Sequence, residues 1–233
     1  MIDCYIRNLG TINYPRAWKI QEEISTKMSE GKNCHTLLIL EHTPVFTIGL
    51  RGKREDILLG EESLESMGIS IREADRGGEV TYHGPGQLVG YPILDLHNWG
   101  GPVRYVRAIE SALIGTLQSF GVPCERVEGE TGVWVPGPQT AIEFRRKIAS
   151  IGLRISRGIS THGFALNINP DLSFFDHIIP CGIRDHGTTS IAQELGQVPK
   201  LAEIQSQLVK KLEQHLERRM SFGTNSTIGV SQF

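Results

Sequence analysis

Cys181 is a candidate nucleophile because its neighbours restrict the backbone around it. It stands between Pro180 and Gly182. Proline fixes φ, and glycine leaves an unhindered backbone that can approach a developing oxyanion. Most free cysteines are instead small buried hydrophobic residues, so the residues around Cys181 leave both interpretations open.

Lys147 could supply a cation and a base beside such a thiol. It opens the run Lys-Ile-Ala-Ser-Ile-Gly at 147–152, where small side chains leave room for a ligand and partial burial would lower the lysine pKa toward neutrality. A lysine taken at random is more often a surface residue at a strand edge.

The stretch from Arg76 to Gln87 has the composition of a ligand-binding loop. It reads Arg-Gly-Gly-Glu-Val-Thr-Tyr-His-Gly-Pro-Gly-Gln and lies between two strand-like runs. Glycines let the backbone approach a ligand closely, Arg76 adds a fixed cation, and His83 adds a titratable imidazole. A purely structural turn would not need both charges.

Helices and strands must alternate along the chain to position these segments. Apolar residues at helical spacing predict helices from Pro15 to Gly31, near 57–67, at 102–120, near 189–195 and from Pro199 to Leu216. Strands are expected at 36–41, 45–48, 69–72, 79–82, 87–95, 133–135, 147–155 and 163–168. The Pro-Gly-Pro segment at 136–146 suggests a hairpin tip or flexible loop. We therefore predict one α+β domain over residues 1–220, a mixed sheet packed against helices, and a flexible tail at 221–233.

Composition limits the classes of function that the protein can have. The 233 residues are 39% hydrophobic, enough for one substantial core, and a net charge of -2 gives no general attraction for nucleic acid or an anionic membrane. The longest aliphatic run, Leu37 to Leu40, is far too short to span a bilayer. The four cysteines form no C-x-x-C pair, so we expect no metal site and a reducing, cytoplasmic location. We interpret the remaining three as small buried hydrophobic residues: Cys4, Cys34 and Cys124.

Taken together, the segments resemble those of the octanoyltransferases. These enzymes move an octanoyl chain from acyl carrier protein onto lipoyl domains. The resemblance runs from Arg76 through the strand at 88–96, includes the Lys147 segment and Gly-Ile-Ser-Thr-His-Gly-Phe-Ala-Leu-Asn-Ile at 158–168, and reaches Pro-Cys-Gly at the expected interval. It covers about residues 5–195. The segment 136–146 and the C-terminal helix with its tail depart from the family pattern.

The resemblance implies a fold, partners and roles. The fold would be the biotin/lipoate protein ligase type, Cys181 would carry the acyl group as a thioester, and Lys147 would lie beside the reacting carbonyl. The donor would be octanoyl-acyl carrier protein. The acceptors would be lipoyl domains of 2-oxoacid dehydrogenase complexes and the glycine cleavage H protein. No cofactor is expected, because the thioester already holds the driving force.

A substrate pocket is expected around this dyad. Small residues would form the walls of a narrow acyl channel, Val80, Tyr82, Ile151 and Phe164 its apolar lining, and His83 and His162 would flank the acyl head. The candidate substrate-binding residues are Arg76, Gly77, Gly78, Glu79, Val80, Thr81, Tyr82, His83, Ser150, Ile151, Gly152, His162, Gly163, Phe164 and Ala165. The neighbouring pair Asp185-His186 could suggest a Cys-His-Asp triad, which the resemblance does not support.

Three alternatives compete with octanoyl transfer. An ATP-dependent lipoate or biotin ligase would share the fold and the Lys147 strand but would not need Cys181. A thioesterase would use the same cysteine and send water to the acyl-enzyme. A non-catalytic lipoyl-domain binder would have no reason to keep both Cys181 and Lys147.

Overall fold

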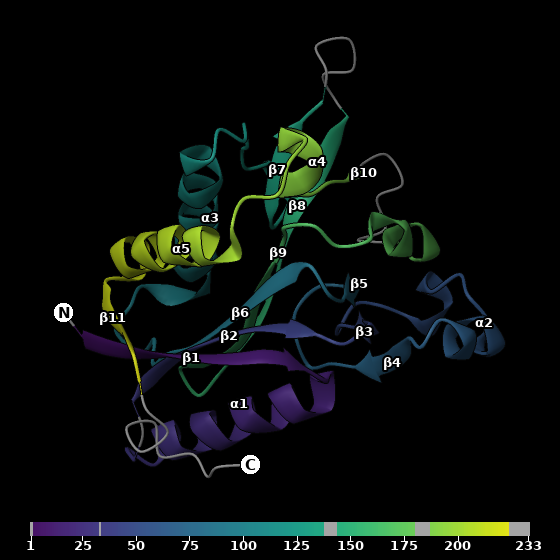
Figure 1. Cartoon of the computed structure of the whole chain (residues 1–233). Coiled ribbons are helices and arrows are strands. Elements are labelled where there is room, and N and C mark those ends of the chain that lie inside the picture. The colour runs from purple at the N-terminus through teal and green to yellow at the C-terminus, as the bar shows by residue number, and fades with distance from the viewer. Residues whose placement is uncertain (1, 33, 138–143, 180–186, 224–233) are drawn as a thin grey trace.

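The elements follow the predicted alternation closely. The computed structural model describes residues 2–32, 34–137, 144–179 and 187–223 (Figure 1). Its helices are α1 (Tyr14–Ser29), α2 (Glu61–Ser66), α3 (Gly101–Ser119), α4 (Ile191–Leu195) and α5 (Leu201–Leu216), with 3-10 turns η1 (Arg54–Asp56) and η3 (Leu172–His177). Its strands are β1 (Ile2–Ile12), β2 (His35–His42), β3 (Val45–Ile48), β4 (Ser70–Glu73), β5 (Val80–His83), β6 (Gln87–Ile93), β7 (Val133–Pro136), β8 (Arg145–Ser156), β9 (Ile159–Asn167), β10 (Gly187–Thr188) and β11 (Arg218–Phe222).

The strands form one large mixed sheet and one small sheet. The large sheet has the order β10-β8-β9-β6-β2-β1-β11, with β7 added alongside β8, and the small sheet has the order β4-β3-β5. Strands β2, β6, β9 and β8 pair antiparallel, while β1 runs parallel to both β2 and β11. This arrangement confirms the predicted α+β class with a mixed sheet packed against helices.

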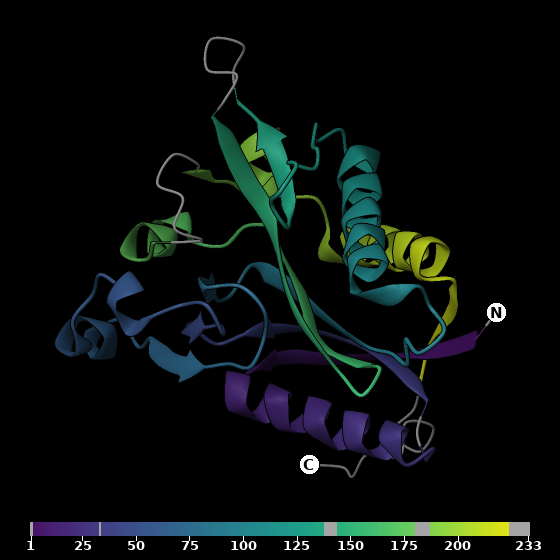
Figure 2. The same ribbon diagram turned by 180° about the vertical axis from the view of Figure 1, so that it is seen from behind.

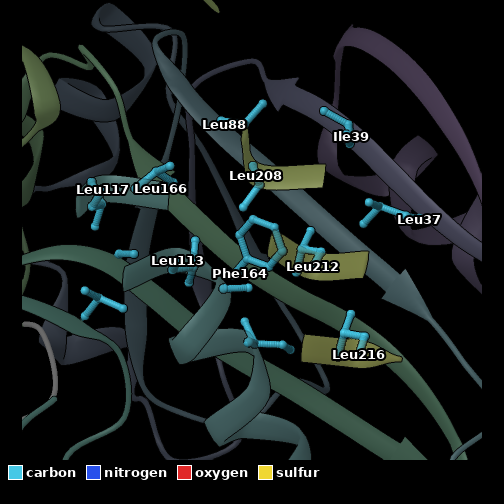
Figure 3. Close-up of a cluster of buried hydrophobic side chains, with 14 of the residues drawn as sticks. Leu37, Ile39, Leu88, Leu113, Leu117, Phe164, Leu166, Leu208, Leu212 and Leu216 are labelled. Atoms are coloured by element: carbon cyan, nitrogen blue, oxygen red, sulfur yellow. The ribbon is translucent and has the colours of Figure 1, made fainter. Parts of the chain in front are cut away.

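Helices cover both faces of the large sheet (Figures 1 and 2). On one face, α1 buries Ala17, Ile20 and Ile24 against Leu38 and Leu40 of β2. On the other, leucines of α3 and α5 pack against Leu37, Ile39 and Phe164 (Figure 3). Because successive side chains of a strand point to opposite faces, burial of both faces explains the continuous aliphatic run in β2.

The sequence analysis did not predict the two-residue strand β10 or the longer strands β1 and β11. β1 buries only Cys4 and Ile6 completely, while Asp3 and Arg7 alternate with them, so its first residues lack a strong apolar signal. β11 then pairs with β1 in parallel, with Ile2 opposite Arg218. It extends to Phe222, two residues past the expected domain boundary, and residues 224–233 lie outside the described part of the chain.

Other boundaries moved for local reasons. The helix expected near 57–67 is confined to α2, because Gly60 supplies an extended N-cap and the preceding turn is 3-10. The strand expected at 163–168 starts earlier, at Ile159, because β8 and β9 form a continuous hairpin with Ser156 opposite Ile159. Pro136 pairs with Arg145, so the two ends of the 136–146 segment lie beside each other in antiparallel β7 and β8, and residues 138–143 lie outside the described ranges.

No helix within the described ranges has both the length and the apolar character needed to cross a bilayer.

Shortening a buried side chain where α5 packs against the sheet should destabilise the protein. Leu212 is fully buried against the sheet, so we expect Leu212→Ala to lower the free energy of unfolding by about 2 to 5 kcal/mol. Leu201→Ala, at the 42% exposed first residue of the same helix, should stay within about 1 kcal/mol of the parent. Urea unfolding followed by circular dichroism measures both. Equal losses would contradict this packing.

Candidate active site

A pocket of about 450 Å³ lies where β5 and the loop before it meet the β8–β9 hairpin. It brings together segments separated by more than 60 residues of sequence. Lys147 lines it, as do all the sequence-predicted substrate-binding residues except Tyr82. The Tyr82 ring packs instead against Phe46 and Phe174, so it supports the pocket wall from behind.

The β8–β9 hairpin fixes two predicted segments beside each other. Its register places Ser150 opposite Ala165 and Ile151 opposite Phe164. It also places Gly152 opposite Gly163. Side chains directly opposite in an antiparallel pair lie within contact distance, and successive residues point to opposite faces. Ser150 and Ala165 therefore share one face of the hairpin with Gly152 and Gly163, while Ile151 and Phe164 share the other.

Two of the pocket glycines make room for the protein's own backbone. A Cβ at Gly152 would lie 2.7 Å from the Gly77 carbonyl oxygen, and one at Gly163 would lie 2.2 Å from the Gly90 carbonyl oxygen. The Gly77 amide donates a hydrogen bond to the Leu153 carbonyl at 3.0 Å. These glycines therefore bring the loop and the neighbouring strand against the hairpin, besides lining the pocket.

Arg76 fixes the glycine loop from within. Its side chain is 7% exposed and donates to the Thr47 hydroxyl at 2.7 Å, the Thr47 carbonyl at 2.8 Å and the Glu79 carbonyl at 2.8 Å. Because Thr47 belongs to β3, the guanidinium ties the loop to the small sheet. The sequence offered no signal for Thr47, a threonine inside a short apolar strand.

Lys147, another lining residue, is held between two neighbouring strands. It pairs with Trp134 across β7–β8, and its Nζ lies 4.3 Å from the centroid of the Trp134 ring, a cation–π contact. On its other side it pairs with Thr188 of β10, and the Thr189 amide donates to its carbonyl at 3.0 Å. The strand is therefore held from both sides, and Lys147 is half-buried.

Cys181, with Asp185 and His186, lies outside the described residues. The described chain stops at Ile179, whose amide donates to the Asp56 carbonyl at 2.8 Å, and resumes at Gly187, which lines the pocket.

The other three cysteines are poor nucleophiles. Burial raises the pKa of Cys4 to about 12 and that of Cys124 to about 11, and it also raises the pKa of Cys34. These thiols keep their protons at neutral pH, and only a thiolate attacks an acyl group efficiently.

A cluster of rings that the sequence analysis largely missed extends from the pocket wall into the interior: Tyr14, His42, His83, Tyr91 and His162. The Tyr14 ring stacks against both His83 and His162, with centroids 6.2 and 6.4 Å apart. The residues come from α1, β2, β5, β6 and β9, so no local motif announces the cluster.

Asp75 fixes His162 within this cluster. The His162 Nε2 donates to the Asp75 carboxylate at 2.7 Å, and its Nδ1 lies 3.5 Å from the Tyr14 hydroxyl. His162 also has φ of 56°, a left-handed conformation uncommon for a residue other than glycine. Its position directly before Arg76 was the only hint the sequence gave of Asp75.

Burial keeps the three histidines neutral. It lowers the pKa of His42 to about 4, that of His162 to about 3, and that of His83 well below its usual value, with Arg76 adding to the effect at His83 and His162. Within the described ranges, no group of three or more His, Cys, Asp or Glu side chains is arranged to hold a metal ion.

Comparison with known proteins decides the family. The model of the lipoyl protein ligase A/B catalytic domain matches residues 13–213. An octanoyltransferase of Chloroflexus aggregans is 46% identical over 209 residues, covering 89% of this chain and 92% of the relative. One of Acidobacterium capsulatum is 48% identical, covering 83% and 81%. The chain belongs to the lipoyl protein ligase A/B family and, within it, to the octanoyltransferases. It is therefore an enzyme, and the family predicted from its motifs is confirmed.

Solved structures show the same fold. A lipoate-protein ligase A bound with ATP has a TM-score of 0.68 at 14% identity, covering 97% of this chain and 90% of the other. A biotin protein ligase of Aquifex aeolicus with biotin and ATP has a TM-score of 0.56 at 13% identity, covering 91% and 70%. The predicted biotin/lipoate protein ligase fold is confirmed.

The neutral histidines should make stability depend on pH. Their pKa values are lower in the folded than in the unfolded chain, so between about pH 6.5 and 4 the unfolded chain binds more protons. The free energy of unfolding should therefore fall as the pH drops through this window, by up to about 1.4 kcal/mol per pH unit for each histidine. Urea unfolding at a series of pH values measures the slope.

His42→Gln provides the comparison for this slope. It removes one titrating ring, so its slope below pH 6.5 should be shallower than that of the parent, while the two slopes at pH 7 to 8 should agree. Identical slopes from pH 6.5 to 4 would show that His42 does not titrate in this way.

Proposed function

We propose that this enzyme moves an octanoyl group from octanoyl-acyl carrier protein to a lysine of a lipoyl domain, through a thioester on Cys181. The observation that carries the proposal is that Lys147, the Arg76 loop and the β9 segment predicted from the sequence line one pocket. Family membership supports the same reaction.

In the first half-reaction, the Cys181 thiolate attacks the carbonyl of the donor thioester. The tetrahedral intermediate collapses with loss of the carrier thiolate, which takes a proton from the Lys147 ammonium and departs as a thiol. The octanoyl group stays on Cys181, and Lys147 is left neutral. One thioester replaces another, so the step is close to thermoneutral. A free thiol with a pKa of about 8.5 is only slightly ionised at neutral pH, so the Lys147 ammonium assists by stabilising the thiolate.

In the second half-reaction, the amine of the acceptor lysine attacks the Cys181 thioester. An amide forms, the Cys181 thiolate leaves, and the amine gives up one proton. Lys147 in its neutral form takes that proton, so the same residue serves both steps. The amide is more stable than the thioester, and no ATP is consumed.

The shape of the pocket suits an eight-carbon chain. Val80 and Ile151 supply apolar surface to the lining, and Phe164, whose ring packs in the core, borders it. A volume of about 450 Å³ falls within the range of small-molecule sites. Arg51 also lines the pocket, with 72% of its side chain exposed, where it could contact an acidic carrier protein.

The acceptor proteins and the cellular location follow from the same proposed reaction. We propose lipoyl domains of 2-oxoacid dehydrogenase complexes and the glycine cleavage H protein as acceptors. The reaction would take place in the cytoplasm, where cysteines stay reduced. An ATP-dependent ligase shares this fold, but the octanoyltransferase relatives favour thioester transfer.

Substitutions at the two proposed catalytic residues should separate their roles. Cys181→Ser should abolish transfer, because a neighbouring lysine does not ionise a hydroxyl. Lys147→Ala should lower transfer by about two to four orders of magnitude, and Lys147→Arg should not restore it, because arginine keeps the charge but cannot release a proton near neutral pH. Transfer to a purified lipoyl domain, measured by intact mass, gives these rates.

Cys124→Ser is the matched control, because its half-buried thiol lies outside the pocket lining. It should transfer at nearly the parental rate. Parental activity in Cys181→Ser, or a requirement for ATP, would replace the covalent mechanism with the ligase alternative.

A further inference from the structure

We propose that Nε2 of His83 binds the amine of the acceptor lysine and orients it for attack. The inference rests on the proposed octanoyl transfer and assigns one wall of its pocket to the second substrate. His83 lines the pocket and is only 6% exposed.

The hydrogen bonds around His83 determine its tautomer. Nε2 of Gln87 lies 3.1 Å from the Tyr82 carbonyl oxygen, which can only accept, so this atom is the amide nitrogen and Oε1 is the free acceptor. Nδ1 of His83 lies 2.7 Å from that Oε1 and must therefore carry the proton. In the neutral ring, Nε2 is left with a lone pair, and the described residues offer it no hydrogen-bond partner.

A second amide fixes this orientation. Nε2 of Gln87 also donates to Oδ1 of Asn167 at 2.9 Å, and Nδ2 of Asn167 donates to the Thr189 carbonyl at 3.0 Å. Rotating either amide would place two acceptors face to face in the buried interior, which costs more than a lost hydrogen bond. The row of hydrogen bonds from His83 through Gln87 and Asn167 to Thr189 therefore allows only one arrangement of donors and acceptors.

Tyr91, like His83, presents a hydrogen-bond acceptor to the pocket. Nδ1 of His42 lies 2.9 Å from the Ile12 carbonyl oxygen and must donate to it, so Nε2 of His42 accepts from the Tyr91 hydroxyl at 2.7 Å. The hydroxyl proton is thus committed, and the Tyr91 oxygen retains only lone pairs. We call His83 and Tyr91, which both line the pocket, the acceptor wall.

The acceptor wall favours a ligand group that donates a hydrogen bond. The reacting end of an octanoyl thioester has an oxygen and a sulphur and no donor, so it gains nothing there. The acceptor lysine has N–H groups. Burial keeps the wall uncharged, and the nearby Arg76 cation disfavours an ammonium, so the wall favours the neutral amine that is competent to attack.

Two amide substitutions separate binding by Nε2 from a structural role. His83→Asn keeps a donor near the Nδ1 position, and thus the bond to Gln87, but it ends short of Nε2. His83→Gln extends an amide oxygen toward the Nε2 position and loses the Nδ1 donor. Acylation by octanoyl-acyl carrier protein and transfer from the isolated acyl-enzyme to a lipoyl domain are timed separately by intact mass, with melting temperatures for each variant.

We expect His83→Asn to slow transfer about tenfold more than it slows acylation, as loss of one buried hydrogen bond to substrate would do. His83→Gln should transfer faster than His83→Asn although it is the less stable protein. If transfer instead follows stability, or if acylation falls more than transfer, the inference is wrong. The ratio of the two half-reactions in His83→Asn decides even if His83→Gln does not fold.

A failure of the proposed function would look different. In that case the parental enzyme itself would form no acyl adduct with the donor, and the inference would fall with it. An adduct that forms and reacts equally in the parent and in His83→Asn would remove only the role of His83.

Discussion

The register of the β8–β9 hairpin is the constraint on which the pocket depends. It places Ile151 opposite Phe164 and Gly152 opposite Gly163, and it continues to Ala149 opposite Leu166 in the core. A slip of one residue would turn every side chain of one strand to the other face. The same ladder therefore determines both the core under α5 and the wall of the pocket.

Close backbone packing then transmits this register to the loop before β5. The absence of side chains at Gly152 and Gly163 lets the Gly77 carbonyl and β6 approach the hairpin. Buried Arg76 secures the loop from the opposite side through Thr47 of the small sheet. The two sheets thus meet through hydrogen bonds and glycines around the pocket.

The polar cluster at the pocket wall has a chemical consequence. Buried polar groups are tolerated when their hydrogen bonds are satisfied, and here each bond also fixes a proton. His42 and His83 are each held in one tautomer by an acceptor on Nδ1. The cluster therefore positions lone pairs beside the pocket without adding charge.

Much of this arrangement was readable from the sequence. Apolar spacing located α1, α3 and α5, and the family motifs located most of the pocket lining. Tyr82 was predicted to line the pocket, but its ring packs against Phe46 and Phe174 instead. A motif does not show which face of a strand is turned inward.

Other residues escaped because their roles arise from pairings between distant segments. The partner of His162 is Asp75, 87 residues away, and that of His42 is Tyr91, 49 residues away. No local pattern records such contacts. β1 and β11 were missed for a related reason, since β1 becomes a strand by pairing with β2 and β11, and β11 by pairing with β1.

The central claim is that acyl transfer proceeds through a thioester on Cys181, and a pulse-chase measurement tests it most directly. The enzyme is incubated with octanoyl-acyl carrier protein alone, freed of donor, and then mixed with a lipoyl domain in the absence of ATP. The account predicts one octanoyl group on the peptide that contains Cys181 after the pulse, and its appearance on a lysine of the lipoyl domain after the chase. An enzyme that carries no octanoyl group after the pulse, or an adduct that the lipoyl domain cannot discharge, would contradict the account.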